Sequence, residues 1–334
     1  MVEAKLIIAF LVCFIFSLVL LPLVIFVLRK QKIKQTILHY VTMHEGKSGT
    51  PTLGGIGFII PIAVISLIFS SGFKTQALMT IIVTISFALI GFIDDFIKFR
   101  FKQNLGLRPY QKIISQLAIS VAVAIFVYKN QLIGGVINLP FSKNSIDIGA
   151  FIIPFTILIF LATTNSVNLT DGLDGLASGV SVSFLLTFLL VMLAQLANRN
   201  IGENAQLVSE QTNIMIVCAS TIGALLAFLI FNSNPAKVFM GDVGSLSLGG
   251  LIASVCIFSR NSLFIPIIGA CFVASSVSVI IQVAYFKMKR KRVFLMAPLH
   301  HHFEKKGFSE TKIVTAYVVL TLVLGFVCVL SELV

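Results

Sequence analysis

Charged residues are scarce in this chain of 334 residues: 11% are charged, whereas 57% are hydrophobic. A soluble domain carries about 25% charged residues, so the composition argues against a soluble protein and indicates an integral membrane protein. Acidic residues are the scarcer kind, because 13 Asp and Glu face 25 Lys and Arg, for a net charge of +12. In a membrane protein such an excess points to topology and lipid contact, not to nucleic acid.

Cysteine is also rare, and the five cysteines lie inside apolar runs without paired spacing. The pattern supports neither a disulfide framework nor a zinc site, so we expect the thiols to pack as small hydrophobic groups. The first apolar run, Leu6–Leu28, leads into Arg29-Lys30 without a small-residue cleavage site. It is therefore expected to be a retained membrane span and not a signal peptide.

Apolar runs of bilayer-spanning length recur along the chain. A spanning helix needs about 20 mostly apolar residues, and this length predicts an all-α polytopic membrane protein of about ten transmembrane helices, forming a single domain over residues 1–334. The ten runs are Leu6–Leu28, Leu53–Ser70, Ala77–Ile93, Ile113–Tyr128, Ile148–Ser166, Leu176–Leu196, Ile214–Phe231, Gly244–Phe258, Leu263–Phe286 and Ile313–Val329. Pro266 predicts a bend in the ninth. Gly134-Gly135 predicts a small hairpin within Lys129–Asp147.

The distribution of basic residues predicts the orientation. An even number of spans places both termini on one side, and 19 of the 25 basic residues then share the other side. The positive-inside rule makes that side cytoplasmic and puts both termini outside. The polar clusters of the sequence all belong to loops or helix ends on this cytoplasmic side.

One polar stretch, Asn165–Ala177, interrupts the apolar pattern most strongly. Polar groups at the end of a membrane segment are costly unless they are used, so a functional site is the favoured interpretation. Glycines follow two of the acids and predict that the helix gives way to a loop near Asp171. The alternative is an ordinary polar loop with Asp-Gly turns. The polar residues recur at every third position: Asn165, Asn168, Asp171 and Asp174.

A pair of adjacent carboxylates, Asp94-Asp95, closes the third run. Adjacent carboxylates repel each other and need a cation or a proton. Magnesium usually takes one or two carboxylates together with substrate phosphates, and Lys98, one helical turn on, could hold a phosphate as a point charge. The alternative is a solvated helix end with an i,i+4 ion pair.

Three further segments carry candidate site residues: one around Phe239 and Asp242, the histidines at 300–302, and one around Lys47 and Thr52. Phe239 could stack on a flat ring and Asp242 could bind a metal, although the segment also fits an ordinary loop. Consecutive histidines at 300–302 cannot share a helix face and are expected on a loop, where imidazoles could face a phosphate or simply join a basic surface. Lys47 and Thr52 precede the second run and suit an anion site at a helix N-terminus, or else a basic juxtamembrane loop. Together the motifs favour magnesium-assisted phosphoryl transfer from a nucleotide-linked donor.

These motifs resemble the bacterial phospho-N-acetylmuramoyl-pentapeptide transferases of the polyprenyl-phosphate N-acetylhexosamine-1-phosphate transferase superfamily. The resemblance covers essentially the whole chain, although the segment between Asn104 and Lys112 departs from the usual family pattern. The Ala297–Glu304 motif points to this branch over relatives with N-acetylglucosamine-type donors. The residues that carry the resemblance are Gly49–Gly55, Asp94–Lys98, Asn165–Ala177, Asn232, Phe239–Asp242 and Ala297–Glu304.

The resemblance implies that UDP-N-acetylmuramoyl-pentapeptide and undecaprenyl phosphate give lipid I and UMP, with Mg²⁺, at the cytoplasmic face of a bacterial plasma membrane. It implies Asp242 as the metal ligand, with Asp94, Asp95 and His300 as catalytic partners. A homodimer is an expectation from the resemblance alone. The implied substrate contacts are Lys47, Thr52, Lys98, Lys112, Asn165, Asn168, Asp171, Asp174, Asn232, Phe239, Gln282 and His301.

Two alternatives to this reaction remain. The nearer one is a sister transferase that uses UDP-N-acetylglucosamine. The other, from a different class, is a lipid transporter or flippase, which would need ionisable residues near the membrane midplane. The predicted position of the acids at the inner helix ends favours an enzyme over a transporter.

Overall fold

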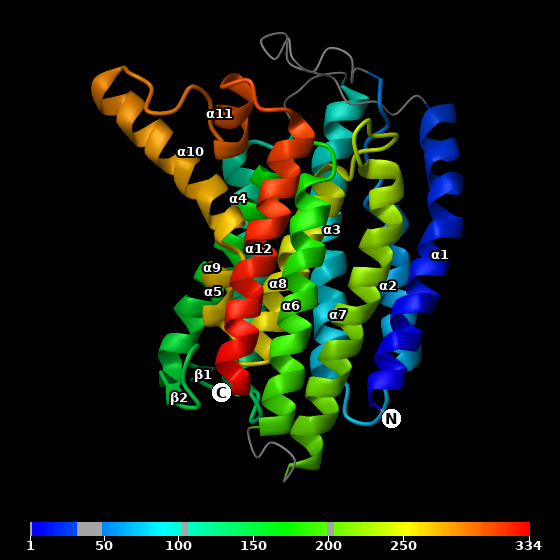
Figure 1. The fold of residues 1–334 in the computed structure, drawn as a ribbon, viewed down its shortest axis with the longest axis vertical. Coiled ribbons are helices and arrows are strands. Elements are labelled where there is room, and N and C mark those ends of the chain that lie inside the picture. The colour runs from blue at the N-terminus through cyan, green and yellow to red at the C-terminus, as the bar shows by residue number, and fades with distance from the viewer. Residues whose placement is uncertain (1, 32–48, 102–105, 199–203) are drawn as a thin grey trace.

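The computed structural model describes residues 2–31, 49–101, 106–198 and 204–334, and it is an all-α polytopic membrane protein (Figure 1). Its long helices run side by side along the long axis of the molecule. The helices are α1 (Val2–Lys30), α2 (Ile56–Phe69), α3 (Thr75–Arg100), α4 (Pro109–Lys129), α5 (Ile152–Thr170), α6 (Leu176–Asn198), α7 (Ala205–Asn232), α8 (Gly241–Phe258), α9 (Ile265–Ile268), α10 (Ala270–Lys289), α11 (Leu299–Lys305) and α12 (Glu310–Leu333), with 3-10 turns at Gly149–Phe151 and Ser262–Phe264.

Nine helices within the described residues are long and apolar enough to cross a membrane, and these correspond to nine of the ten predicted spans. The second predicted span forms the shorter helix α2, whose 14 residues rise about 21 Å against a hydrocarbon core of about 30 Å. Its predicted first turn is not helical, because the backbone there bonds to the segment before α8. Gly54 N donates to Phe239 O at 2.9 Å and Gly55 N donates to Met240 O at 3.0 Å.

Helix α8 forms the centre of the bundle, where it packs against α3 and α5. Nearly all of its residues are buried, and Phe87 of α3 stacks on Phe160 of α5 beside it, with ring centroids 6.0 Å apart. The peripheral helices α1, α10 and α12 instead expose many large apolar side chains. Large exposed apolar surfaces are unusual on soluble monomers and fit contact with lipid. All five cysteines are buried and unpaired, as predicted.

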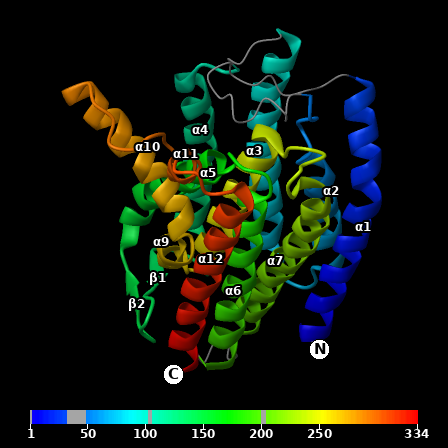
Figure 2. The ribbon, with the colours of Figure 1, turned by 45° about the horizontal axis from the view of Figure 1, so that its top comes forward.

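Both termini lie at one end of the bundle, and α11 lies at the other end (Figure 1). The predicted hairpin is confirmed: strands β1 (Val136–Asn138) and β2 (Ser145–Asp147) pair antiparallel, with Ile137 opposite Ile146. They lie at the same end as the termini. The predicted bend is also confirmed, since the ninth run is interrupted at Gly269 between α9 and α10. Beyond it, α10 diverges from the bundle (Figure 2).

Candidate active site

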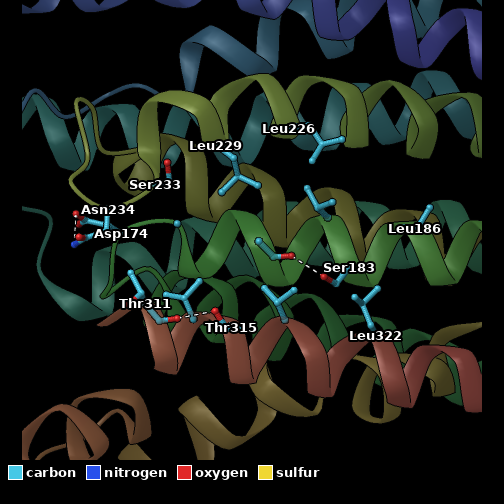
Figure 3. A pocket seen from close by; sticks show the side chains of 15 residues that line it. Asp174, Ser183, Leu186, Leu226, Leu229, Ser233, Asn234, Thr311, Thr315 and Leu322 are labelled. Atoms are coloured by element: carbon cyan, nitrogen blue, oxygen red, sulfur yellow. Dashed lines mark hydrogen bonds between the residues drawn. The ribbon is translucent and has the colours of Figure 1, made fainter. Parts of the chain in front are cut away.

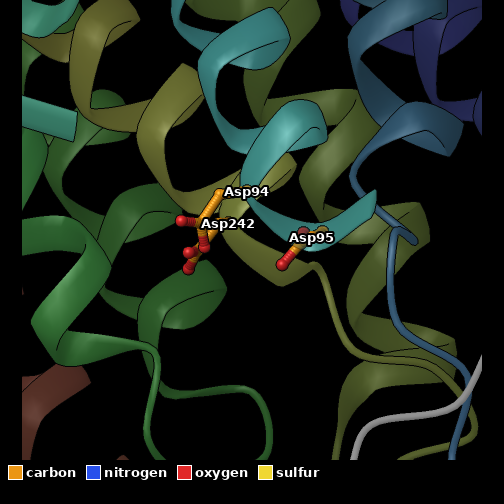
Figure 4. Close-up of side chains that lie close together, drawn as sticks. All are labelled: Asp94, Asp95 and Asp242. Atoms are coloured by element: carbon orange, nitrogen blue, oxygen red, sulfur yellow. The ribbon is translucent and has the colours of Figure 1, made fainter. Parts of the chain in front are cut away.

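Three carboxylates meet where α3 approaches the first turn of α8 (Figure 4). One oxygen from each of Asp94, Asp95 and Asp242 lies within 4.8 Å of the other two. Asp94 and Asp95 are 3% and 5% exposed, so their oxygens are largely removed from water. The third predicted span ends at Ile93, but helix α3 continues to Arg100. Both acids therefore lie on a rigid helix and not in a loop. Clustered carboxylate oxygens of this kind suit a hard cation such as Mg²⁺.

The close approach of α3 and α8 depends on Gly91, one turn before Asp95. A Cβ atom at Gly91 would overlap the main-chain carbonyl of Asp242, so only glycine allows the two backbones to touch here. The Val243 N–H then reaches Asp95 and donates to its Oδ2 at 3.2 Å. Direct backbone contact therefore sets the distance between the acid pair and Asp242.

Two lysines neutralise most of the acidic charge. Lys98 Nζ lies 2.5 Å from Asp94 Oδ2 and 2.8 Å from Asp242 Oδ2. Lys112, in the first turn of α4, lies 2.9 Å from the same Asp242 oxygen. When all three carboxyls are ionised, the acids still exceed the two cations by one negative charge. The structure thus places Lys112 in the site, although the sequence around it departs from the family pattern.

The two asparagines of the central polar stretch have different partners. Asn168 Nδ2 donates to Asp242 Oδ1 at 2.7 Å and to Ser245 Oγ at 2.8 Å. Asn165 Nδ2 instead donates to Gln116 Oε1 at 2.7 Å, which joins α5 to α4. Asn168 therefore belongs to the carboxylate cluster, whereas Asn165 bonds to Gln116 and to the main chain of its own helix. Gln116 and Ser245 were not predicted as site residues, because a single polar residue without other polar neighbours of this kind forms no motif.

Helix α5 ends at Thr170, so Asp171 begins a loop, as the glycines predict. Desolvation in a partly buried position is the main reason that the pKa of the Asp171 carboxyl rises to about 8. The negative charges of Asp242 and Asp95 raise this pKa further. Asp171 is therefore a neutral acid at pH 7, able to donate a hydrogen bond as well as accept one.

Asp174 joins two loops. Its Oδ2 accepts from Ala236 N at 3.0 Å and from Asn234 Nδ2 at 3.3 Å (Figure 3). The loop after α5 is thereby tied to the loop after α7. An apolar pocket of about 450 Å³ between α6, α7 and α12 ends at Asp174 and Asn234, and it does not include the three carboxylates.

A buried asparagine side chain also fixes the loop after α7. Asn232 is 2% exposed, accepts from Ser178 Oγ at 2.7 Å and donates to Val238 O at 3.0 Å. Its amide therefore shapes the loop that leads to Phe239. The Phe239 side chain is partly exposed, and its N–H donates to Pro51 O at 2.8 Å. The ring lies three residues before Asp242 in the chain, and its partial exposure leaves it available for stacking.

The histidine triplet lies on the short helix α11, so the prediction of a loop is wrong. The prediction that the three imidazoles cannot share one helix face is confirmed, because each ring has different surroundings. His300 is fully buried, and a Cβ atom at Gly172 would overlap its Nε2, which places it against the Asp171–Gly175 loop. His301 Nδ1 pairs with Glu304 Oε2 at 2.6 Å. His302 Nδ1 accepts from Leu295 N at 3.1 Å and holds the chain before α11.

Two further predicted substrate contacts, Gln282 and Thr52, have different surroundings. Gln282 Oε1 accepts from Val293 N and Phe294 N at 3.1 and 3.0 Å, so its amide supports the segment after α10. Thr52 lies near the acid pair and the start of α8, since a Cβ atom at Gly241 would come 2.5 Å from Asp95 Oδ2 and 2.8 Å from Thr52 Oγ1. Lys47 lies outside the described residues.

Comparison with known proteins identifies the family of this chain. The family model for glycosyl transferase family 4 matches residues 77–260, which include all three clustered carboxylates. Curated relatives named phospho-N-acetylmuramoyl-pentapeptide-transferase match over nearly the whole chain. One from Clostridium botulinum is 43% identical over 323 residues, covering 96% of this chain and 95% of the relative. One from Clostridioides difficile is 41% identical, covering 96% of both chains.

A more distant relative gives the same result. The protein of that name from Halalkalibacterium halodurans is 39% identical over 336 residues and covers 99% of both chains. Full coverage includes α11 and its histidines, which the family model does not reach. The chain therefore belongs to glycosyl transferase family 4 and, by its identity over nearly its full length, to the phospho-N-acetylmuramoyl-pentapeptide-transferases.

Proposed function

We propose that this protein transfers phospho-N-acetylmuramoyl-pentapeptide from its UDP donor to undecaprenyl phosphate, giving lipid I and UMP. The observation that carries the proposal is the convergence of three carboxylates and two lysines at one end of a membrane bundle. The names of the relatives give the transferred group, phospho-N-acetylmuramoyl-pentapeptide, and the lipid acceptor is proposed on the resemblance of the motifs. The excess of basic residues in the loops at this end supports a cytoplasmic site in a bacterial plasma membrane.

The carboxylate cluster fits a magnesium ion. Asp242 is the proposed ligand, with Asp94 and Asp95 beside it, because their oxygens lie within 4.8 Å of one another and are mostly shielded from water. When bound, Mg²⁺ would offset the negative charge of the donor's phosphates. Lys98 and Lys112, which pair with Asp242 in the structure, would then be available to phosphate oxygens.

The proposed chemical step is direct. An oxygen of the lipid phosphate forms a bond to the β-phosphorus of the donor, the bond from that phosphorus to the oxygen bridging to the α-phosphate breaks, and UMP leaves. Asp94 or Asp95 orients the lipid phosphate or accepts its proton. The competing scheme makes an aspartate the nucleophile. A trapped phosphosugar-enzyme adduct in the absence of lipid phosphate would overturn the direct step.

The remaining residues are proposed to hold the donor. Phe239 stacks on uracil. The Asp171–Gly175 loop accepts hydrogen bonds from the nucleotide and donates hydrogen bonds to it. His300 and His301, which lie against that loop, face the donor's phosphates. The roles of the other predicted contacts are proposed on the resemblance alone: Lys47, Thr52, Asn165, Asn232 and Gln282.

A two-donor assay tests the proposal. The purified protein receives undecaprenyl phosphate, Mg²⁺ and either UDP-N-acetylmuramoyl-pentapeptide or UDP-N-acetylglucosamine, and UMP release is measured. UMP is expected from the first donor only, and EDTA should abolish it until Mg²⁺ is restored. UMP from the second donor only would assign the sister activity. Lipid transport in proteoliposomes without UMP from either donor would assign a transporter.

A further inference from the structure

A small polar network joins three segments that are distant in the sequence. Asn234, after α7, donates through Nδ2 to Asp174 Oδ2 at 3.3 Å and to Glu310 Oε2 at 2.6 Å. Glu310, in the first turn of α12, also accepts from the Asp174 main-chain N–H, with Oε1, at 3.1 Å. Each oxygen of the Glu310 carboxylate thus binds a different loop.

Glu310 has more hydrogen-bond partners from other segments than a carboxylate at the start of a helix needs. A glutamate in the first turn of a helix is stabilised by that helix's own dipole, and such stabilisation does not require partners from other segments. Here Glu310 accepts from residues of two other segments, and Asn234 stands between two carboxylates that would otherwise repel each other. Hydrogen bonds to a charged carboxylate are shorter and stronger than neutral ones, so the network resists separation of the loops.

Both loops lead to proposed donor contacts. The Asp171–Gly175 loop carries Asp171 and touches His300. The loop after α7 leads to Phe239 and then to Asp242 at the start of α8. A change in the spacing of the two loops would therefore move the proposed nucleotide contacts relative to each other.

We propose that Glu310, acting through Asn234 and Asp174, is a positioning residue that fixes the spacing of the two nucleotide-binding loops and so sets the affinity for the uridine end of the donor. The inference rests on the proposed function. It distinguishes Glu310 from the clustered carboxylates, since Glu310 would govern donor binding and not the chemical step.

The test is a steady-state comparison of the wild-type protein with Glu310→Ala, Glu310→Gln and Glu3→Ala. Glu3 is the matched control, because it also lies in the first turn of a helix but at the far end of the bundle. UDP-N-acetylmuramoyl-pentapeptide and undecaprenyl phosphate are varied separately. Glu310→Ala removes both hydrogen bonds of the carboxylate and should raise the KM for the donor at least about tenfold, the effect expected from one charge-assisted hydrogen bond, and leave kcat and the KM for the lipid within about twofold.

Glu310→Gln separates positioning from simple loss of volume. Its amide has the size of the carboxylate but can accept with only one oxygen, so one of the two donors faces an NH₂ group. Its donor KM should rise nearly as far as that of Glu310→Ala, and this variant decides the matter if Glu310→Ala does not fold. A merely structural residue would instead lower the melting temperature and kcat while the donor KM stays unchanged.

Asn234→Asp adds an electrostatic readout. It places a third carboxylate between Asp174 and Glu310, so repulsion should separate the two loops and raise the donor KM. Unchanged donor KM values in all three network variants would overturn the inference. Absence of UMP release from wild type and from Glu3→Ala would instead refute the proposed function, and the inference with it.

Discussion

Replacement of Asp242 by asparagine is the sharpest test of the site, because it removes one charge and almost no volume. The wild-type carboxylate accepts from Lys98 at 2.8 Å, from Lys112 at 2.9 Å and from Asn168 at 2.7 Å. An asparagine oxygen can still accept from Asn168 Nδ2. The two lysines, however, lose the carboxylate that they share, and the proposed metal loses its principal ligand.

The effects on stability and on rate should differ greatly in size. Lys98 keeps Asp94 and Asp95 as partners, whereas Lys112 loses the one carboxylate to which it is bonded among the described residues. Loss of one charge-assisted bond costs about 1.5–3 kcal/mol, or a few degrees in melting temperature. For the reaction, removal of a preorganised electrostatic group costs about 10²–10³ in kcat, and loss of the metal adds to this. We expect kcat to fall at least about 10³-fold, equivalent to about 4 kcal/mol.

The assay is UMP release under saturating donor and lipid phosphate, with melting temperature measured on the same preparation. Asp242→Asn should remain folded and insert into membranes, but with almost no turnover at any Mg²⁺ concentration. Turnover that recovers at high Mg²⁺ would show weakened metal binding only. A rate similar to that of the wild type would remove Asp242 from the metal role and refute the reasoning from the cluster.

Substitutions at three further positions test separate parts of the site. Phe239→Ala should raise the KM for the UDP donor about tenfold and Phe239→Tyr should not, because stacking of a base on an aromatic ring is worth about 1–3 kcal/mol; initial-rate measurements check both. Lys112→Gln should lower kcat/KM for the donor about 10–100-fold and leave the KM for lipid phosphate less changed, as separate titrations of the two substrates would show. Asp171→Asn should stabilise the metal-free protein at high pH. Folded Asp171 has a pKa of about 8 against about 3.9 unfolded, so wild-type stability falls as pH rises between these values; thermal unfolding in EDTA at pH 5 and pH 8.5 should show the advantage of the variant growing with pH, and a constant difference would contradict the pKa.

The fold could be predicted from hydropathy because the bilayer imposes a length on each helix. Nine spans, the hairpin and the bend followed from apolar runs, glycines and Pro266. The short helix α2 did not, since hydropathy does not report that Gly54 and Gly55 donate their N–H groups to another loop. Hydropathy also underestimated the length of some helices. Polar residues can continue a helix when a partner from another segment pairs with them, and hydropathy does not report such partners.

The site could be predicted as a set of motifs but not as a geometry. Asp94, Asp95 and Asp242 converge as their residue types suggest. The four residues at every third position do not act together, because Asn168 bonds to Asp242 while Asn165 bonds to Gln116. Such differences arise from helix packing, which spacing along one segment does not encode. Glu310 was missed because a single glutamate at a helix start carries no motif.

The backbone contact at Gly91 has a consequence for the tolerance of this protein to substitution. The spacing of the carboxylates depends on two main chains that touch, and no rotamer change can accommodate an added methyl group there. Gly91→Ala would move the acid pair relative to Asp242 without altering any polar group. A map of inactivating substitutions should therefore place this apolar, chemically inert position among the carboxylates themselves, and a search for functional residues restricted to reactive side chains would overlook it.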